Sequence, residues 1–205
     1  MNDATKFWEG SFGNSYTDRN ELSRLRIERQ ARLWSKIVGP MLPERPKTIL
    51  EVGSNTGANL WALHSHFPSA HLYAVEPNDK ARDVLVKSGL IAEGDAYAKL
   101  TDVPGTAELA FTCGCLIHIP PAELYEFCRG IVARAERWVV AIEYFAAEPE
   151  EKVYRGHAGK LWKRDFGGFY LDNFAGLKPI GTGFAWKRTT GLDNLTWWLF
   201  DKGKA

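Results

Sequence analysis

The sequence contains no run of about 20 apolar residues, the length that a helix needs to cross a membrane. Its first residues lack the basic-then-apolar order of a secretory signal. Cysteine is scarce: Cys113, Cys115 and Cys128 form no paired framework and have no spacing typical of a metal site. These absences favour a cytoplasmic protein without structural disulfides, a bound metal or a membrane span.

Strong charge of one sign is also absent. The 26 Lys and Arg residues nearly balance the 25 Asp and Glu residues, for a formal net charge of +1. Without a basic field, nothing predicts nucleic-acid binding. No repeat, low-complexity tract or linker divides the 205 residues, and 45% of them are apolar, so we expect a single domain with a core of its own. No feature predicts an oligomer.

What the sequence does contain, from Lys47 onward, is an alternation of strand and helix patterns. The expected strands are 48–52, 71–75, 107–112 and 138–143, with an extended piece at 89–92, and the expected helices are 58–67, 79–87 and 121–135. Because the apolar runs are continuous rather than alternating, they predict strands buried on both faces, as in a parallel sheet covered by helices. Residues 179–187 and 195–200 can pair as antiparallel strands at a sheet edge. The pattern predicts an α/β fold: a mostly parallel, twisted, doubly wound sheet with an antiparallel C-terminal edge strand.

The first 40 residues are different in character. Aromatic residues and glycines are interleaved at 7–13, which indicates an ordered loop or lid rather than a tail. A basic helix is expected at 20–38, and Gly39-Pro40 end it.

The most informative segment is 49–57, Ile-Leu-Glu-Val-Gly-Ser-Asn-Thr-Gly. It places Gly53 and Gly57 where a buried strand turns tightly into a helix, so that the backbone can approach a ligand closely. The spacing differs from the G-x-G-x-x-G of dinucleotide enzymes, which suits a pyrophosphate. S-adenosylmethionine (SAM) has no phosphate and fits this turn better. The alternative is a plain strand-turn-helix glycine pair without a ligand.

Acidic residues follow the next two expected strands. Glu76, in Val75-Glu76-Pro77, lies where a ribose held at the glycine turn would present its hydroxyls, and a carboxylate can accept from both. Asp95, in Gly94-Asp95-Ala96, is expected to accept from an adenine amino group. Either residue could simply be solvated at a strand end, but polar signals at three successive strand ends favour one common ligand.

A fourth segment, 111–120, follows another buried strand. Its small residues Cys113 and Gly114 leave room beside a cofactor, and we interpret the cysteines as space-filling residues. His118 is a candidate general base, because an unperturbed imidazole titrates near neutral pH. A lone histidine is more often structural, and that alternative stays open here.

Together these segments resemble class I SAM-dependent methyltransferases. Further segments resemble the pseudaminic acid biosynthesis-associated methylases: 7–20, 115–120, Glu143-Tyr144, 154–157 and 161–166. The resemblance spans nearly the whole chain and implies a Rossmann-like class I methyltransferase fold, SAM as cofactor and a sugar pathway. One departure is Phe145-Ala146, where the family pattern has Tyr-Asn after Glu-Tyr. The expected division is a lid segment and helix at 1–40, a cofactor core at 47–145 and an acceptor segment at 146–205.

The expected site has three parts. Cofactor contacts are expected from Tyr16, Arg19, Glu51, Gly53, Ser54, Asn55, Gly57, Asn59, Glu76, Pro77, Asp95, Ala96, Cys113 and Gly114, with Tyr16 and Arg19 near the methionine carboxylate. The candidate catalytic residues are His118 and Tyr144. The acceptor is expected to contact Glu143, Tyr154, Arg155, His157, Lys163 and Arg164. The four cationic side chains in this set favour an anionic acceptor.

The predicted reaction is methyl transfer from SAM to an oxygen or nitrogen atom of a small polar, anionic acceptor, such as a nonulosonic-acid-type sugar or its activated form. A second hypothesis is methylation of an amine or guanidino group on a peptide or natural product, which would call for carboxylates that are scarce at 154–166. A third is a non-catalytic SAM-binding module, against which the intact glycine and acidic motifs argue. The glycine spacing disfavours a nicotinamide dehydrogenase.

Overall fold

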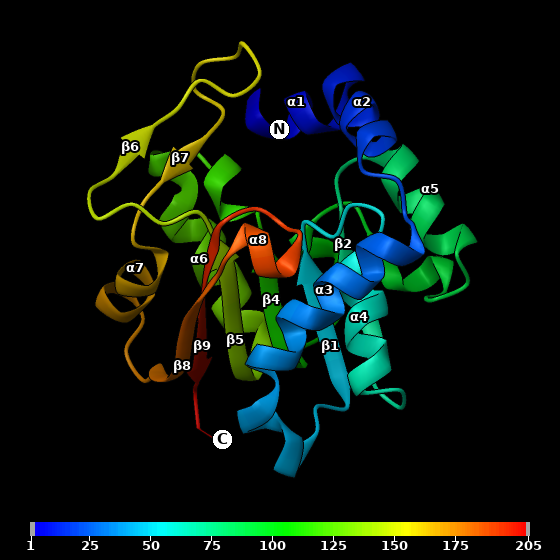
Figure 1. Cartoon of the computed structure of the whole chain (residues 1–205), viewed down its shortest axis with the longest axis vertical. Coiled ribbons are helices and arrows are strands. Elements are labelled where there is room, and N and C mark those ends of the chain that lie inside the picture. The colour runs from blue at the N-terminus through cyan, green and yellow to red at the C-terminus, as the bar shows by residue number, and fades with distance from the viewer. Residues whose placement is uncertain (1–2, 204–205) are drawn as a thin grey trace.

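The computed structural model describes residues 3–203, and side chains from residue 5 onward. The first residues, on which the expected absence of a signal sequence depends, lie partly outside this range. A seven-stranded sheet in the order β3-β2-β1-β4-β5-β9-β8 forms the centre of the molecule (Figure 1). Its strands are β1 (Thr48–Val52), β2 (His71–Val75), β3 (Ala96–Tyr97), β4 (Ala107–Cys113), β5 (Ala135–Glu143), β8 (Lys178–Ala185) and β9 (Leu195–Asp201).

Strands β1 to β5 are parallel, whereas β9 runs antiparallel between β5 and β8. The predicted α/β fold, with a mostly parallel sheet and antiparallel C-terminal pairing, is therefore confirmed. The last strand is inserted inside the sheet, however, and β8 forms its edge. A separate two-stranded sheet pairs β6 (Glu150–Glu151) with β7 (Trp162–Lys163).

Helices cover both faces of the sheet. The α-helices are α1 (Asp3–Glu9), α2 (Ser11–Arg19), α3 (Arg24–Ile37), α4 (Ala58–His66), α5 (Asp79–Lys87), α6 (Pro121–Arg134), α7 (Phe166–Asn173) and α8 (Lys187–Thr190). Short 3-10 turns are η1 (Gly39–Glu44), η2 (Glu93–Asp95), η3 (Leu100–Asp102) and η4 (Leu116–His118). Helices α3, α4 and α5 supply buried side chains to one core cluster, and α6 and α7 to the other. Burial of the strands on both sides explains their continuous apolar runs.

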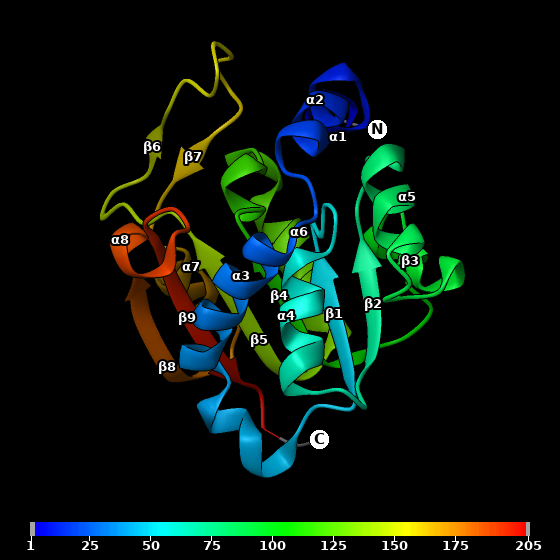
Figure 2. The ribbon, with the colours of Figure 1, turned by 45° about the vertical axis from the view of Figure 1, so that its right-hand side comes forward.

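The segment at 7–13 was expected to be an ordered loop or lid, and in the structure it is helical rather than a loop. Residues 3–19 form α1 and α2, which lie above the C-terminal ends of the parallel strands (Figures 1 and 2). The Trp8 ring of α1 packs against the rings of Phe12 and Tyr16 of α2, with centroids 5.4 and 5.3 Å apart. Gly10 separates the two helices. The expected helix at 20–38 begins only at Arg24, where Ser23 caps it by accepting from the Arg26 N–H.

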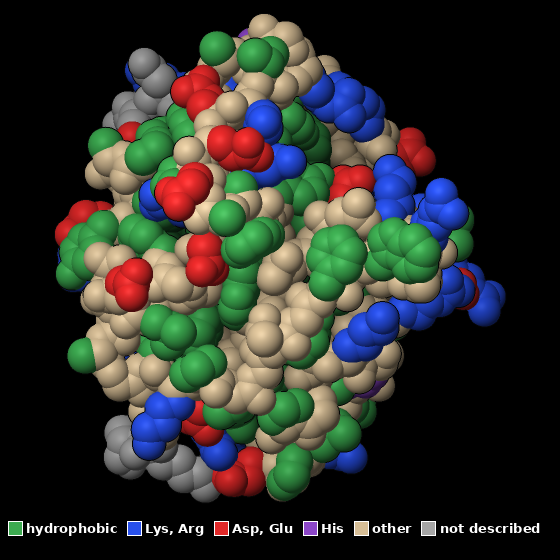
Figure 3. Space-filling view, turned by 60° about the vertical axis from the view of Figure 1, so that its left-hand side comes forward, with side chains coloured by type: hydrophobic (Ala, Val, Ile, Leu, Met, Phe, Trp, Pro, Cys, Tyr) green, Lys and Arg blue, Asp and Glu red, His purple; other side chains and the backbone are tan. Residues whose placement is uncertain are grey.

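Among the described residues, no helix combines the length and the apolar character that a membrane crossing requires. On the face that carries β6, β7 and α7, acidic and basic side chains are interspersed (Figure 3). This distribution agrees with the nearly balanced charge of the sequence and offers no extended basic surface there.

Candidate active site

A cavity of about 390 Å³ opens at the C-terminal edge of the parallel strands. Strand β1 lies at the centre of this edge, flanked by β2 on one side and β4 on the other, so the chain crosses over in opposite directions from it. Open α/β sheets bind ligands at such switch points. The loops after β1, β2, β3 and β4 form the walls, while α1, α2 and α3 contribute Thr5, Trp8, Gly13, Tyr16, Thr17, Arg26 and Gln30.

The turn after β1 requires both of its glycines. Gly53 has φ +83, and a Cβ there would lie 2.7 Å from the Sγ of Cys115. Gly57 has φ +82, and a Cβ there would lie 2.3 Å from a methyl carbon of Leu85 on α5. Gly53 lines the cavity together with Ser54 and Asn55, whereas Gly57 does not. Gly57, which was expected to contact the cofactor, thus lies at the start of α4, where it packs against Leu85.

One end of the cavity is polar and buried. Trp34 on α3 donates its indole N–H to the Asn59 side chain (3.1 Å), which in turn donates to Glu51 at the end of β1 (2.8 Å). Glu51 is fully buried, and burial raises the pKa of its carboxyl well above the usual range. It does not itself line the cavity but holds Asn59, which does. This chain of hydrogen bonds fixes α3 and α4 against the strand end.

Several polar atoms at this end have no hydrogen-bond partner among the described residues. They are Arg26 Nε, Gln30 Oε1, Glu51 Oε2, Ser54 Oγ and both side-chain atoms of Asn55. Buried polar groups are almost always satisfied in folded proteins, so a group of unsatisfied atoms around one cavity indicates a polar ligand. Arg26 and Gln30 were not anticipated from the sequence. Their signal is the four-residue spacing that continues the buried face of α3 toward Leu33, Trp34 and Ile37.

Glu76 lies at the end of β2 and lines the same cavity. Its two carboxylate oxygens accept the backbone N–H groups of Asn55 (2.8 Å) and Asn78 (2.9 Å). Burial raises the pKa of this carboxyl, although the two N–H donors oppose the shift. Each oxygen keeps a second lone pair for a ligand hydroxyl. Glu76 thus joins the glycine turn to the loop after β2, and Pro77 lines the cavity beside it.

Asp95 and Ala96 do not line the cavity, contrary to the expectation that they contact adenine. The third strand is Ala96–Tyr97, not the predicted 89–92, so Asp95 precedes the strand instead of following it. Asp95 therefore lies at the opposite edge of the sheet, where it pairs with His71 at the start of β2 (3.2 Å). The chain reaches the cavity at Ala98, Lys99, Leu100 and Thr101.

The loop after β4 is held by Glu143, which was expected to contact the acceptor. Its buried carboxylate accepts the backbone N–H groups of Cys115 (3.2 Å), Leu116 (3.1 Å) and Ile117 (3.4 Å). Burial raises its pKa to about 7. Because both oxygens are occupied by the loop, Glu143 positions η4 and does not line the cavity.

Cys113, Gly114 and Cys115 line the cavity along this loop. Burial raises the pKa of the Cys113 and Cys115 thiols, so both are neutral at physiological pH. Within the described part of the chain, no group of three or more His, Cys, Asp or Glu side chains is placed to hold a metal ion. Both cysteines, with their small side chains, form part of the cavity wall.

His118 lines the cavity at the end of η4. Its Nδ1 lies 2.7 Å from the carbonyl oxygen of Lys160, which can only accept, so Nδ1 carries a proton and Nε2 keeps its lone pair in the neutral ring. Burial lowers the pKa of His118 to about 4. The ring packs against Trp8 (centroids 4.6 Å apart) and Tyr154 (4.9 Å). His118 is therefore a neutral imidazole held in a fixed orientation, with Nε2 unprotonated.

Tyr144, the second candidate catalytic residue, does not line the cavity. Its hydroxyl donates to Asp193 (2.6 Å), and this carboxylate together with burial raises the pKa of the phenol. The ammonium of Lys163 lies 5.5 Å from the centre of the Tyr144 ring. These contacts place Tyr144 in a polar cluster with Asp193 and Lys163.

Helices α1 and α2 roof the cavity. Trp8 and Tyr16 line it, and the rings of Phe7 and Phe12 pack against His157 at 5.1 and 5.4 Å. Arg19, expected near the methionine carboxylate, is instead exposed, with its guanidinium over Phe12 and Tyr16.

Asn78 connects this roof to the body of the protein. Its side-chain NH2 donates to the Trp8 carbonyl (3.0 Å) and to Asn14 (2.9 Å). Its side-chain oxygen accepts from the Ala81 N–H (3.0 Å) and from the Thr17 hydroxyl (3.3 Å). Because the Asn78 backbone N–H donates to Glu76, the roof is joined directly to the end of β2.

The four cationic residues expected to hold the acceptor do not form one cluster. Arg155 is exposed at φ +50, with its guanidinium 6.0 Å from the Tyr154 ring centre, and His157, also exposed, packs against the rings of Phe7 and Phe12. Lys163 and Arg164 line a different cavity. Arg155 lies in the segment that joins β6 to β7, whereas Arg164 comes directly after β7. Strand β7 and the turn before it therefore separate the two arginines in space.

No protein-family model matches this chain, and no curated protein matches its sequence. The structure is similar to solved methyltransferases. With the magnesium protoporphyrin IX methyltransferase ChlM of Synechocystis PCC 6803, solved with bound S-adenosylhomocysteine (SAH), it shares 12% identity at a TM-score of 0.69, over 97% of this chain and 98% of that one. With the 1,6-didemethyltoxoflavin-N1-methyltransferase of Burkholderia thailandensis the identity is 16% and the TM-score 0.68, over 94% of this chain and 86% of that one. With the mitomycin 7-O-methyltransferase MmcR the identity is 12% and the TM-score 0.69, over 98% of this chain and 61% of that one. The fold is thus that of class I SAM-dependent methyltransferases.

Proposed function

We propose that this chain is a SAM-dependent methyltransferase that uses the 390 Å³ cavity to bind SAM beside a small acceptor. The observation that carries the proposal is Glu76, which joins the glycine turn to the end of β2 and faces a cavity with one polar end. A nucleoside with an amino-acid tail matches this arrangement. The unsatisfied atoms of Arg26, Gln30 and Ser54 suit the amino acid, and the lone pairs of Glu76 suit the ribose hydroxyls.

The adenine would lie against the apolar walls beyond Glu76. Pro77, Ala98, Leu100, Ile119 and Phe127 form these walls. Asp95, which was expected to accept from the adenine amino group, does not line the cavity. The backbone groups of 98–101 and the side chain of Glu123 do line it and are the candidate partners of the adenine.

For the chemical step, bound SAM supplies an electrophilic methyl group on its sulfonium. The protein aligns the acceptor with it, excludes water under α1 and α2, and accepts a proton where one must leave. His118 can take this proton on Nε2, because its Nδ1–H is held by the Lys160 carbonyl. Tyr144 would act on the acceptor only after leaving Asp193.

We further propose an anionic acceptor, with a nonulosonic-acid-type sugar or its activated form as the candidate. Support comes from the resemblance of the outer motifs and from cationic side chains near the roof, including Arg155 and Lys160, that form no ion pair with the residues that the structure describes. An amine acceptor has less support: Glu150 already pairs with Lys152 (2.8 Å), and Glu151 accepts from the Gly159 N–H.

Two measurements test this proposal. In calorimetry, SAM and SAH should bind with micromolar affinity, and NAD should bind more weakly; tighter binding of NAD would overturn the cofactor assignment. Incubation with SAM and N-acetylneuraminate, or its nucleotide-activated form, should add the mass of one methyl group. If neither sugar is methylated while SAH binds, the cofactor proposal stands and the sugar proposal falls.

Arg26→Gln should weaken SAH binding by roughly 10- to 100-fold, because a guanidinium–carboxylate bond contributes about 1.5–3 kcal/mol. Calorimetry with 5′-methylthioadenosine, which lacks the amino-acid carboxylate, separates this effect from a general distortion. Its affinity should be unchanged in the variant. Arg24→Gln, on the same helix but exposed and paired with Glu28, is the matched control. An equal loss for SAH and methylthioadenosine would contradict the assignment of Arg26.

His118 should titrate at about pH 4 in the folded protein, against 6.5 for an unperturbed histidine. NMR of the ring carbon protons, assigned with His118→Gln, measures this directly. Since the folded pKa is depressed, the contribution of the neutral ring to stability is complete above pH 6.5 and is lost as the pH falls toward 4. Thermal melts across this range should show a drop in the wild type that is smaller in His118→Gln. Titration of His118 near 6.5 would show that the ring is solvated and not held by Lys160.

A further inference from the structure

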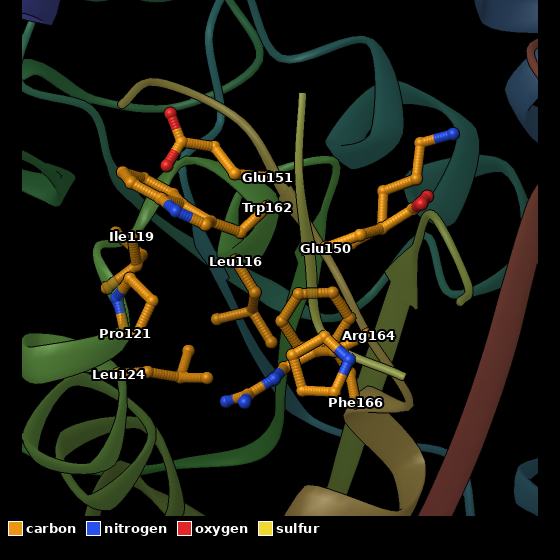
Figure 4. Close-up of a pocket in the computed structure, with 11 residues that line it drawn as sticks. Leu116, Ile119, Pro121, Leu124, Glu150, Glu151, Trp162, Arg164 and Phe166 are labelled. Carbon is orange, nitrogen blue, oxygen red and sulfur yellow. The ribbon is translucent and has the colours of Figure 1, made fainter. Parts of the chain in front are cut away.

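A second cavity, of about 220 Å³, lies beside the first (Figure 4). It is bounded by the start of α6, by η4 and by the small β6–β7 sheet; its lining includes Leu116, Ile119, Pro121, Leu124, Trp162 and Arg164. Ile119 lines both cavities, and His118, the residue before it, lines the first. The two cavities are therefore separated by little more than the η4 segment.

The walls of the second cavity combine apolar surface with two cationic side chains, Arg164 and Lys163, of which Lys163 lies over the Tyr144 ring. Leu116, Leu124 and Phe166 form apolar walls. Across the described residues, the Arg164 side chain forms no ion pair and no hydrogen bond; its guanidinium lies 5.1 Å from the Phe169 ring centre. In Figure 4 it points toward Leu124 and away from the carboxylates of Glu150 and Glu151.

The acidic residues of this cavity do not balance Arg164, because both are already bonded. Glu150 pairs with Lys152, and Glu151 accepts the N–H of Gly159. An arginine that is partly buried without a carboxylate is a ready partner for an anionic group of a ligand.

We infer that this second cavity binds the distal part of the methyl acceptor, an apolar group that carries an anion paired with Arg164, while the atom to be methylated lies near His118. The inference rests on the proposed methyltransferase function. It also restricts the acceptor: a bare polyhydroxylated sugar would leave the apolar walls unmatched, whereas an acyl or aryl substituent beside an anion would fill them.

The probes for this inference are 4-ethylbenzoate and its neutral amide, 4-ethylbenzamide. Each is titrated into the full-length protein with and without excess SAH, and the indole N–H resonance of Trp162, assigned with Trp162→Phe, reports binding in this cavity. The benzoate should bind roughly tenfold tighter than the amide because of the charge-assisted bond to Arg164. Arg164→Gln should remove this preference, and Arg164→Lys should keep part of it.

Arg188→Gln is the matched control, since Arg188 is an exposed arginine that also lies beside a ring, that of Trp186. It should leave both affinities unchanged, and SAH affinity should be the same in all variants. Equal binding of benzoate and amide, a preference that persists in Arg164→Gln, or an unmoved Trp162 resonance would overturn the inference. Failure of the wild type to bind SAH would instead overturn the proposed function, while the Trp162 resonance would still report on the cavity.

Discussion

Replacement of Glu76 by Ala should reduce SAH affinity by roughly 100-fold or more. Loss of a buried acceptor for the ribose hydroxyls accounts for about 1–3 kcal/mol. The same carboxylate also holds the N–H groups of Asn55 and Asn78, so its removal loosens the glycine turn and the loop after β2 together. Because both effects weaken the same wall of the cavity, the loss of SAH affinity should exceed that caused by the loss of a single hydrogen bond.

Calorimetry measures this loss, and circular dichroism melts show whether the variant remains folded. Asp79→Asn is the matched control, because Asp79 is an exposed neighbour on α5 that pairs with Arg82. Glu76→Gln should fall between the control and Glu76→Ala, since its single carbonyl oxygen can hold only one of the two N–H groups. Unchanged SAH affinity in Glu76→Ala would contradict the placement of the ribose.

Deletion of residues 1–19 should leave a folded protein that has lost most of its cofactor affinity. The helices α1 and α2 supply the Trp8 and Tyr16 walls of the cavity, and burial of two aromatic side chains against a ligand is worth about 3 kcal/mol or more, which is roughly 100-fold in affinity. The body keeps Asn20, whose carbonyl accepts from Thr56 and whose side chain accepts from Arg26.

Arg19→Ala is the control for this deletion. Arg19 is exposed on the outer side of the roof and does not line the cavity, so its loss should change SAH affinity little. Asn78→Ala should reproduce part of the deletion, because it removes the side-chain bonds to Trp8 and Asn14 without removing the helices. Full SAH affinity in the deleted protein would show that α1 and α2 serve assembly or stability instead.

The order of strands and helices and the position of the glycine turn could be predicted because both depend on local signals. Continuous apolar runs indicate burial on two faces wherever the strands lie, and the positive φ angles at Gly53 and Gly57 demand glycine. Glu76 followed from the same logic, since it comes directly after the predicted strand 71–75. Its position at a strand end was enough to place it beside the glycine turn.

Asp95 could not be placed because its strand has only two residues and no periodicity to reveal it. Because the strand begins a few residues later than predicted, the Asp95 carboxylate lies before its first residue and not after its last one. Glu143 was misjudged for another reason: an acidic residue at a strand end looks the same whether it faces a ligand or accepts three backbone N–H groups from a neighbouring loop.

The sequence by itself determined the elements whose residues act within one helix turn or one strand: the doubly wound sheet, the glycine turn and the acidic end of β2. Only the tertiary structure decided which distant side chains share a cavity. Arg26 and Gln30 reach the cavity beside the glycine turn because α3 packs against α4, the helix that begins at this turn. Arg155 and Arg164 are separated because β7 lies between them. Such placements depend on packing between elements far apart in the chain, and no local pattern of residues encodes them.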